Sequence, residues 1–455
     1  MPTIPAVKTP PVLQLLNWIF RPLAYMEANY RQYGDFFHAH WQILNWVFVS
    51  HPDALKTMLT QDTTDVFSAP GSTNAVLKPL LGEKSVILLD GPAHRQRRKL
   101  IMPPFHGERL KVYADLIQHI THTVMGEMTV GQTFQARDVM QKITMRVILQ
   151  AVFGLHEGDR YQRLETLLAE RLNMVSSPLS STLVFFPALQ QDWGRWSPGH
   201  KIARRAQEID ELLYAEIRDR RANPDPSRDD VLSLLLQAQD EDGEGLSDGE
   251  LRDELMTLLV AGHETTATAL AWSLYWTHHH PEIKARLGQE IETAADRDEA
   301  IALTKLPYLG AVCNETLRIY PVAMLTFARM AHQSIELAGY QVEPGTILAG
   351  CIYLLHHRED LYPNPHEFRP ERFLERQYSA FEFMPFGAGA RRCIGYALAM
   401  YELKIVLGTL LTHYDLALTS DRPVQPERRG ITLGMKGGVG MVYQGKRPVA
   451  APALV

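Results

Sequence analysis

The sequence predicts a mainly α-helical protein with a minor β part. From about residue 90 to residue 290, apolar residues recur three and four positions apart, which is the spacing of one helix face. One continuous helical pattern runs from Ser247 to His280, far longer than an average helix. Short strand-like runs occur near the two ends, at 46–49 and 434–443. We therefore expect helices to form the body of the protein and small sheets to lie near the termini.

Composition and charge limit the class of protein. The 455 residues allow up to about three average domains, and 45% hydrophobic with 22% charged residues is ordinary for a globular chain with a large core. A net charge of -6 argues against a nucleic-acid partner, which usually selects a basic excess. Cys313, Cys351 and Cys393 lie far apart without C-x-x-C spacing. They predict neither a disulfide framework nor a zinc ribbon, and they favour a reducing cytoplasm.

Two apolar runs need to be tested as membrane segments. The N-terminal run Val12–Phe20 is interrupted by Gln14 and Asn17, so it is too short to span a bilayer and does not follow a signal-peptide pattern. The longer run 255–276 carries Glu264 at its centre, where an unpaired charge in lipid is costly. We expect this second run to be a buried core helix and the chain to have no transmembrane segment.

The longest predicted helix has a recognisable beginning and end. Ser247 followed by Glu250 is a capping box, and Leu246 with Leu251 can form the accompanying hydrophobic staple. The pattern continues to the residue before Pro281, which gives roughly 30 residues and about 45 Å at 1.5 Å per residue. A helix of this length crosses a whole domain.

The segment 386–395 is the strongest chemical signal. Gly387 and Gly389 allow tight backbone bends, and a helix is expected to begin at Cys393. Free N–H groups at a helix start, together with neighbouring arginines, lower the pKa of a thiol and suit an anionic metal ligand. The alternative role for a lone cysteine is that of a small buried apolar side chain, and we expect this role for the other two cysteines. A dinucleotide-binding G-x-G-x-x-G fails because Arg392 occupies its third glycine position.

The second signal lies within the long helix, at 261–266. A glycine, a carboxylate and two threonines are unfavourable in an apolar helix, because glycine costs ~1 kcal/mol against alanine. One interpretation is helix packing at Gly262, with a threonine hydroxyl bonding back to a carbonyl. The other is that a bond from Thr265 to Ala261 opens the helix into a groove for small molecules. A zinc motif H-E-x-x-H is excluded because Ala267 stands at the second histidine position.

The pattern Phe386-x-x-Gly389-x-Arg391-x-Cys393-x-Gly395 resembles the cysteine-loop signature of the cytochrome P450 family. The resemblance extends from about residue 30 to the C-terminus and implies one P450 domain over 1–455. In that fold a long central helix lies over a haem, with the cysteine-ligand loop beneath it. The implied cofactor is haem b, iron protoporphyrin IX, with Cys393 as the iron ligand. The implied acid–alcohol pair of oxygen activation is Glu264 and Thr265, which favours the groove interpretation.

The resemblance assigns three further sets of residues. The cations expected to bind the haem propionates are His94, Arg98, Arg329 and Arg391. A charged network with a structural role beneath the cysteine loop is expected at Glu315, Arg318 and Arg372. The expected substrate pocket comprises Val76, Leu77, Leu80, Val86, Ile87, Ala261, Val322, Ala323, Met324 and Ile431. A lid over the substrate is expected near Phe185, Phe186, Trp193 and Trp196.

The implied activity is hydroxylation of a C–H bond with O2 and two electrons from a separate protein. The pocket residues predict a hydrophobic substrate, with a long-chain fatty acid first, because the forms of 369–373 and 384–386 resemble the fatty-acid-oxidising branch. A terpenoid or steroid is the second choice. A haem-thiolate peroxygenase and a gas sensor are less favoured, since neither needs the acid–alcohol pair.

The resemblance also predicts the redox partner. We expect a cytoplasmic monomer that receives electrons from an acidic ferredoxin or flavodoxin. The expected docking cations on the cysteine side are Arg95, Arg97, Lys99, Arg392 and Lys404.

Overall fold

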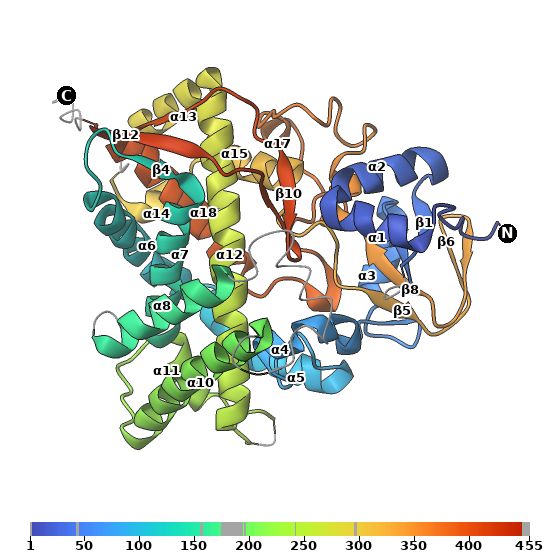
Figure 1. Ribbon diagram of the computed structural model, residues 1–455, viewed down its shortest axis with the longest axis horizontal. Helices are drawn as coiled ribbons and strands as arrows, with labels where there is room; N and C mark the ends of the chain where they lie inside the picture. The colour runs from blue at the N-terminus through green and yellow to red at the C-terminus, as the bar shows by residue number, and fades with distance from the viewer. Residues whose placement is uncertain are drawn as a thin grey trace.

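The computed structural model of the protein describes residues 2–41, 45–154, 158–173, 194, 197–241, 243–294 and 298–447. Helices make up most of the structure, as predicted, and short strands lie near the two ends of the chain (Figure 1). Further strands at 133–135 and within 329–350 were not predicted. The four aromatic residues of the expected lid lie outside the described residues.

The helices fall before and after the unassigned stretch that follows residue 173. The first group is α1 (Pro11–Phe20), α2 (Pro22–Tyr33), α3 (Pro52–Thr60), η1 (Gly71–Leu77), α4 (Lys78–Leu81), α5 (Gly91–Ile101), η2 (Pro103–Phe105), α6 (Arg109–Gly126), α7 (Ala136–Phe153) and α8 (Asp159–Asn173). The second group is α10 (Pro198–Ala222), α11 (Val231–Gln237), α12 (Asp248–His279), α13 (Pro281–Thr293), α14 (Ala300–Leu303), α15 (Pro307–Ile319), α16 (Ile352–His356), α17 (Arg372–Glu375), η5 (Gly389–Arg391) and α18 (Tyr396–His413).

Four small sheets complete the described structure. The largest has the strand order β1 (Phe36–His40), β2 (Asn45–Val49), β8 (Ile347–Gly350), β5 (Arg329–Ala331) and β3 (Phe67–Ser68). The second joins β4 (Thr133–Gln135), β12 (Gly440–Lys446) and β9 (Tyr414–Leu418). Two hairpins are β6 (Ile335–Leu337) with β7 (Tyr340–Val342), and β10 (Pro426–Arg429) with β11 (Thr432–Met435). The run 434–443, expected as one strand, is divided between β11 and β12 because Gly437 and Gly438 both adopt positive φ.

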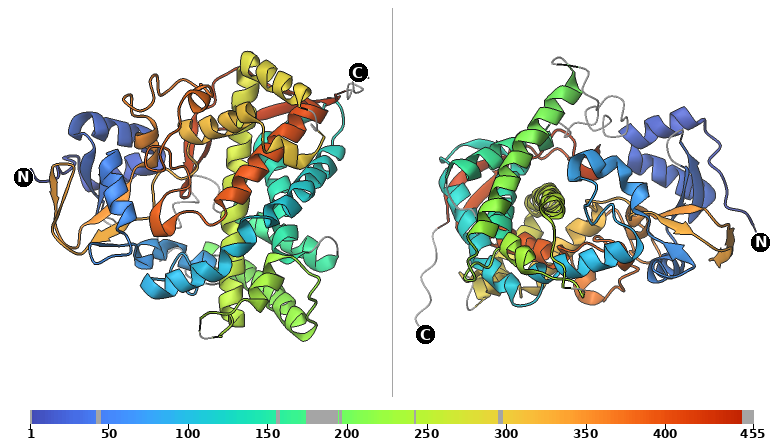
Figure 2. Two further views of the ribbon diagram at one scale, coloured as in Figure 1. Left: turned by 180° about the vertical axis from the view of Figure 1, so that it is seen from behind. Right: turned by 90° about the horizontal axis from the view of Figure 1, so that it is seen from below.

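Helix α12 runs through the middle of the molecule, and Figure 2 shows it end-on at the centre of the view from below. Its predicted capping box is confirmed: the Ser247 side chain accepts from the Glu250 N–H, and Glu250 accepts from the Ser247 N–H at 3.0 Å. Leu251, Leu270 and Trp272 are fully buried on different faces. Such all-round burial is typical of a helix that crosses a large core.

Three apolar cores hold these elements together. The largest includes buried side chains of α6, α7, α12 and α18, and two smaller cores lie under the five-stranded sheet and beside α1 and α2. Within the described residues, no helix combines the length and apolar content needed to cross a bilayer.

Candidate active site

The cysteine loop makes a tight turn, and at one of its positions only glycine fits. Gly387 and Gly389 have φ values of 67° and 72°, in the left-handed region. A Cβ on Gly389 would lie 2.3 Å from an Asp62 carboxylate oxygen and 2.4 Å from the Leu59 carbonyl oxygen. The turn closes where the Cys393 N–H donates to the Phe386 carbonyl at 3.0 Å. Helix α18 begins three residues after the cysteine, at Tyr396, so the prediction that it begins at Cys393 was wrong.

The thiol of Cys393 differs from the other two in accessibility. Cys313 and Cys351 are fully buried, whereas the Cys393 side chain is exposed although protein atoms surround it closely. Burial raises the pKa of the Cys393 thiol, while the Gly395 N–H and the cations Arg98 and Arg392 lower it by less. The expected acidic thiol is therefore not produced by the protein alone, since desolvation outweighs the neighbouring positive charge.

Two of the expected haem-binding side chains carry unused donors. His94 is buried and Arg98 is half-buried on one face of α5, and neither side chain makes a hydrogen bond within the described part of the chain. Arg98 lies close enough to Cys393 for each to affect the pKa of the other. Burial lowers the pKa of His94 most, and the positive charges of Arg391, Arg98 and Arg329 lower it further, to about 3. The role of His94 as a partner of the haem propionates therefore stays a prediction.

Arg329 and Arg391 instead have most donors bonded to protein. Arg329 is fully buried and pairs with Asp62 at 2.7 Å, and it also donates to the Ala388 carbonyl at 3.1 Å. Arg391 donates to the carbonyls of residues 69, 86, 87 and 89 at 2.5–3.4 Å. These two arginines therefore tie the cysteine loop to the segments beside it. Asp62, which also accepts from the Ala390 N–H, was missed because nothing in its local sequence marks it.

These residues fit an anionic haem. An accessible thiol offers an iron ligand, and unpaired donors on His94 and Arg98 offer partners for carboxylates. Arg329 and Arg391 add positive charge beside them, and among the described residues Asp62 is the carboxylate within hydrogen-bond reach. Asp90 lies 3.8 Å from Arg391. An excess of buried cations over carboxylates favours a bound anion.

The middle of α12 presents an accessible surface in an otherwise buried helix. Ala261 is exposed and Thr265 is partly exposed, whereas the residues from 266 to 275 are buried. The Thr265 hydroxyl donates to the Ala261 carbonyl at 2.5 Å, which is the predicted bond. A Cβ on Gly262 would lie 2.9 Å from Ile148 of α7, so this glycine also permits close helix packing. Both interpretations of the segment therefore have a structural counterpart.

Glu264 points toward α7 and is held there. It accepts from Arg137 at 2.6 Å and from Gln141 at 2.7 Å, and 18% of its side chain is exposed. The neighbouring His263 bonds to Thr144 at 2.8 Å, and burial lowers its pKa to about 3. These α7 partners lie more than 115 positions away along the chain, so no local pattern could reveal them.

The charged network beneath the cysteine loop is buried and fully engaged. Glu315 accepts from Arg318 at 2.6 and 2.8 Å, from Arg372 at 3.1 Å and from the Arg369 N–H at 2.8 Å. Arg318 also donates to the His356 carbonyl at 2.8 Å. The His356 ring accepts from the Met384 N–H at 3.0 Å, just before the cysteine loop. His356 was not predicted, yet it connects this network to the loop.

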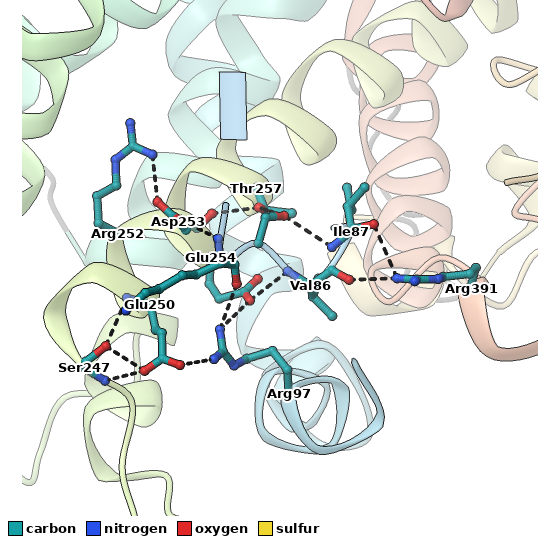
Figure 3. A network of polar contacts seen from close by, with 12 residues as sticks. Val86, Ile87, Arg97, Ser247, Glu250, Arg252, Asp253, Glu254, Thr257 and Arg391 are labelled. Carbon is teal, nitrogen blue, oxygen red and sulfur yellow. Dashed lines mark hydrogen bonds and ion pairs between the residues drawn. The ribbon is translucent and has the colours of Figure 1, made fainter. Parts of the chain in front are cut away.

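The segment 84–87 is fixed between α12 and the cysteine loop, as Figure 3 shows. The N–H groups of Lys84 and Val86 donate to Asp253 and Glu254, at 2.8 and 2.9 Å. On the other side, the Val86 and Ile87 carbonyls accept from Arg391. Val86 is buried, whereas Val76, Leu77, Leu80 and Ile87 are partly exposed. This clamp holds segment 84–87 against the buried residues Asp253 and Glu254 of α12, about two turns before Ala261.

Arg97 belongs to the same network, which corrects its predicted place on a docking surface. It is buried and pairs with Glu254 at 3.0 Å and with Glu250 (Figure 3). Burial raises the pKa of Glu254 to about 7, partly offset by Arg97. Lys404 donates to the Thr304 carbonyl at 2.9 Å, and Lys99 pairs with Glu241. The carboxylates that bind Arg97 lie 153 and 157 positions away along the chain. The spacing of charged residues on its own helix could therefore not predict them.

The remaining pocket residues lie around a contact between residue 323 and β11. Ala323 bridges to Thr432, and the Leu433 N–H donates to the Val322 carbonyl at 2.9 Å. Ala323 and Ile431 are exposed, whereas Val322 and Met324 are buried, with Met324 in the core beside α1 and α2. Ala323 and Ile431 therefore offer more accessible apolar surface than their buried neighbours.

The family model and the relatives reported below all point to one protein family. A family model described as "Cytochrome P450" matches residues 5–439. "Putative cytochrome P450 135B1" of Mycobacterium bovis is 36% identical over 431 residues, covering 94% of this chain and 89% of that protein. "Putative cytochrome P450 137" of Mycobacterium tuberculosis is 34% identical, covering 93% and 88%.

Two solved structures share the fold. A structure described as retinoic acid bound cyanobacterial CYP120A1 superposes with a TM-score of 0.83 at 25% identity, covering 98% of this chain and all of the other. The cytochrome P450DA heme domain gives a TM-score of 0.84 at 23% identity, covering 98% and 99%.

Proposed function

We propose, from the premise that this chain belongs to the cytochrome P450 family, that it hydroxylates a long apolar carboxylic acid, with Cys393 as the iron ligand. Family membership makes it a haem-iron monooxygenase. The proposal adds the haem b form, the roles of individual residues and the substrate class. We also propose that one domain over residues 1–455 carries the whole site.

The bound haem would supply dioxygen activation, and the thiolate favours cleavage of the O–O bond. The chain's own residues hold and orient that group. Cys393 offers its sulfur from a rigid loop, and His94 with Arg98 offers N–H donors to carboxylates. Arg329 and Arg391 contribute positive charge while they fix the loop to Asp62 and to segment 84–87.

Glu264 and Thr265 are proposed to deliver protons to the reaction site. The Thr265 hydroxyl donates to Ala261 in the resting helix and can turn to bind a polar atom on the accessible side. Glu264 is partly exposed at its ion pair with Arg137, so the carboxylate can exchange protons with solvent. A peroxygenase or a gas sensor would require no such pair. Turnover that depends on an electron donor distinguishes the monooxygenase from both.

The observation that carries the assignment of Cys393 is its accessible thiol in the Gly389 turn beside Arg98. We expect Cys393→Ala to abolish the red-shifted Soret band of the reduced carbon monoxide complex. Cys313→Ala and Cys351→Ala, which alter buried thiols elsewhere, are the matched controls and should keep the band. A Cys393→Ala protein that retains the band would refute the assignment.

Thr265→Ala tests the proton assignment separately. The variant should bind haem and substrate as the wild type does, because the lost hydroxyl bonds only within its own helix. Coupling of electron consumption to product should fall by at least about tenfold, because a positioned proton-transfer group typically contributes about 10²–10⁴-fold. Measured peroxide and excess water would account for the missing electrons. Unchanged coupling would rule out this role for Thr265.

The substrate class rests on apolar surface and on one relative. Leu77, Leu80, Ile87, Ala323 and Ile431 are accessible in the described structure. The cyanobacterial relative is described as retinoic acid bound, and retinoic acid is an elongated apolar carboxylic acid of the terpenoid class, so it supports both candidate classes. We place a long-chain fatty acid first and a terpenoid or steroid second. Titration of a lipid and terpenoid panel, read as a low-to-high-spin shift of the haem band, tests the order.

The electron donor is proposed to be an acidic ferredoxin or flavodoxin acting on a cytoplasmic monomer. Arg95 and Arg392 are exposed, and Arg392 lies 4.0 Å above the Tyr396 ring at the start of α18. Reversal of both charges should slow the first electron transfer and weaken its salt dependence. Reversal of Arg31, an exposed arginine on α2, is the control. Equal rates in both variants would remove support for this docking surface.

A further inference from the structure

Helix α1 exposes an apolar face that no described part of the chain covers. Val12, Leu13, Leu16 and Phe20 are 55%, 50%, 44% and 53% exposed. At about 100° per residue, these four positions fall within roughly one quarter to one third of the helix circumference. They include most of the large apolar side chains of a ten-residue helix, so the face is continuous.

The opposite face anchors α1 firmly to the protein. Gln14 is buried and donates to the Val7 and Thr9 carbonyls at 3.3 and 2.7 Å, and it accepts from the Tyr25 hydroxyl at 3.1 Å. Trp18 stacks on Trp41 with ring centroids 4.9 Å apart. The apolar face is therefore held outward by buried polar and aromatic contacts.

The charge around α1 is opposite in sign to that of the whole chain. Lys8 and Arg21 are exposed just before and just after the helix, and the first acidic residue of the sequence is Glu27. The complete chain has a net charge of -6. An apolar stripe flanked by cations complements a surface that is apolar inside and anionic outside.

We propose that this face docks on a lipid bilayer surface containing anionic headgroups, with the α1 axis along the surface. Ten residues are too few to span a bilayer, which needs about 20. Lys8 and Arg21 would lie at headgroup level while the four apolar side chains enter the acyl boundary. A second copy of the chain fits less well, because a stable protein interface uses about 20–30 residues on each side.

The position of α1 in the molecule is compatible with docking on a bilayer surface. Figures 1 and 2 show it with α2 at the N-terminal end of the molecule, at the opposite end from β4 and β12. The proposal depends on neither the substrate nor the role of any haem-binding residue.

The test uses the full haem-loaded chain and cosedimentation with vesicles of phosphatidylcholine alone or mixed with phosphatidylglycerol. Wild-type protein should bind the mixed vesicles, and Leu16→Gln with Phe20→Gln should lower the apparent affinity by roughly tenfold. Lys8→Gln with Arg21→Gln should abolish the preference for phosphatidylglycerol, as should added salt. Val130→Gln is the matched control, because Val130 is 72% exposed and lies just before β4.

Two outcomes would overturn the proposal. One is binding to mixed vesicles that is unchanged in the Leu16/Phe20 variant whose circular dichroism and haem spectrum match the wild type. The other is absence of vesicle binding together with a wild-type dimer that the same variant converts to monomer, which would assign the face to a second copy.

Discussion

Two arginine–carboxylate clusters lie on opposite sides of the candidate site, and they differ in how completely their carboxylates are satisfied. Beneath the cysteine loop, both oxygens of Glu315 accept hydrogen bonds, four in total from the side chains of Arg318 and Arg372 and the Arg369 backbone. On α12, Glu254 accepts two bonds at one oxygen, and its other oxygen has no partner among the residues that the structure describes.

The difference indicates different tasks. A buried carboxylate that accepts four hydrogen bonds holds its arginines in one geometry. The half-satisfied Glu254 has a pKa raised to about 7, so its charge changes near physiological pH. The first cluster is a fixed support for the cysteine loop, and the second is a weaker hold on segment 84–87.

Removing the better-satisfied carboxylate should have the largest effect. Glu315→Ala leaves Arg318 and Arg372 buried without their counter-charge, which costs about 3–5 kcal/mol in comparable buried pairs. We expect little soluble haem-containing protein, with a lower urea midpoint for what is recovered. Glu375→Ala, which removes an exposed partner of Arg369, is the control. A free energy of unfolding within about 0.5 kcal/mol of wild type would contradict the support role.

A third buried carboxylate differs from these two because it has no hydrogen-bond partner in the described structure. Glu402 of α18 is buried, makes no hydrogen bond in the described structure, and has a pKa raised to about 8 by burial. The native state therefore holds this proton more tightly than the unfolded chain. Its contribution to stability is full below about pH 4.5 and is lost as pH rises toward 8.

Glu402→Gln should remove that pH dependence. The variant should be more stable than wild type at pH 8, by about 4 kcal/mol, and similar near pH 4.5. Urea unfolding at several pH values measures the two slopes. Parallel slopes would show that Glu402 does not titrate in this range.

Arg97→Met should have the smallest effect of the three. Glu254 can take up a proton when its partner is lost, so we expect a loss of about 1–2 kcal/mol, greater at pH 8 than at pH 6. Arg95→Met, on the exposed face of the same helix, should change stability by no more than about 0.5 kcal/mol. A loss independent of pH would mean that Glu250, not Glu254, carries the interaction.

Local sequence patterns predicted the elements better than the partners of buried charges. The capping box of α12 and the bond from Thr265 to Ala261 involve residues within four positions, and both were predicted. The partners of Arg97 and Glu264 come from distant helices, and they were not. The start of α18 was misplaced because the backbone at Cys393 bonds to Phe386 and has not yet become helical.

The capped start of α12 fixes the rotational phase of everything that follows on this helix. Ser247 sets where the first turn begins, and Thr265 follows about five turns later. Inserting one codon between the cap and Ala261 would rotate Thr265 by about 100°, toward α7 or the core. The same insertion before Ser247 would leave the phase intact. Length variation among descendants of this gene should therefore accumulate before the cap and be eliminated after it.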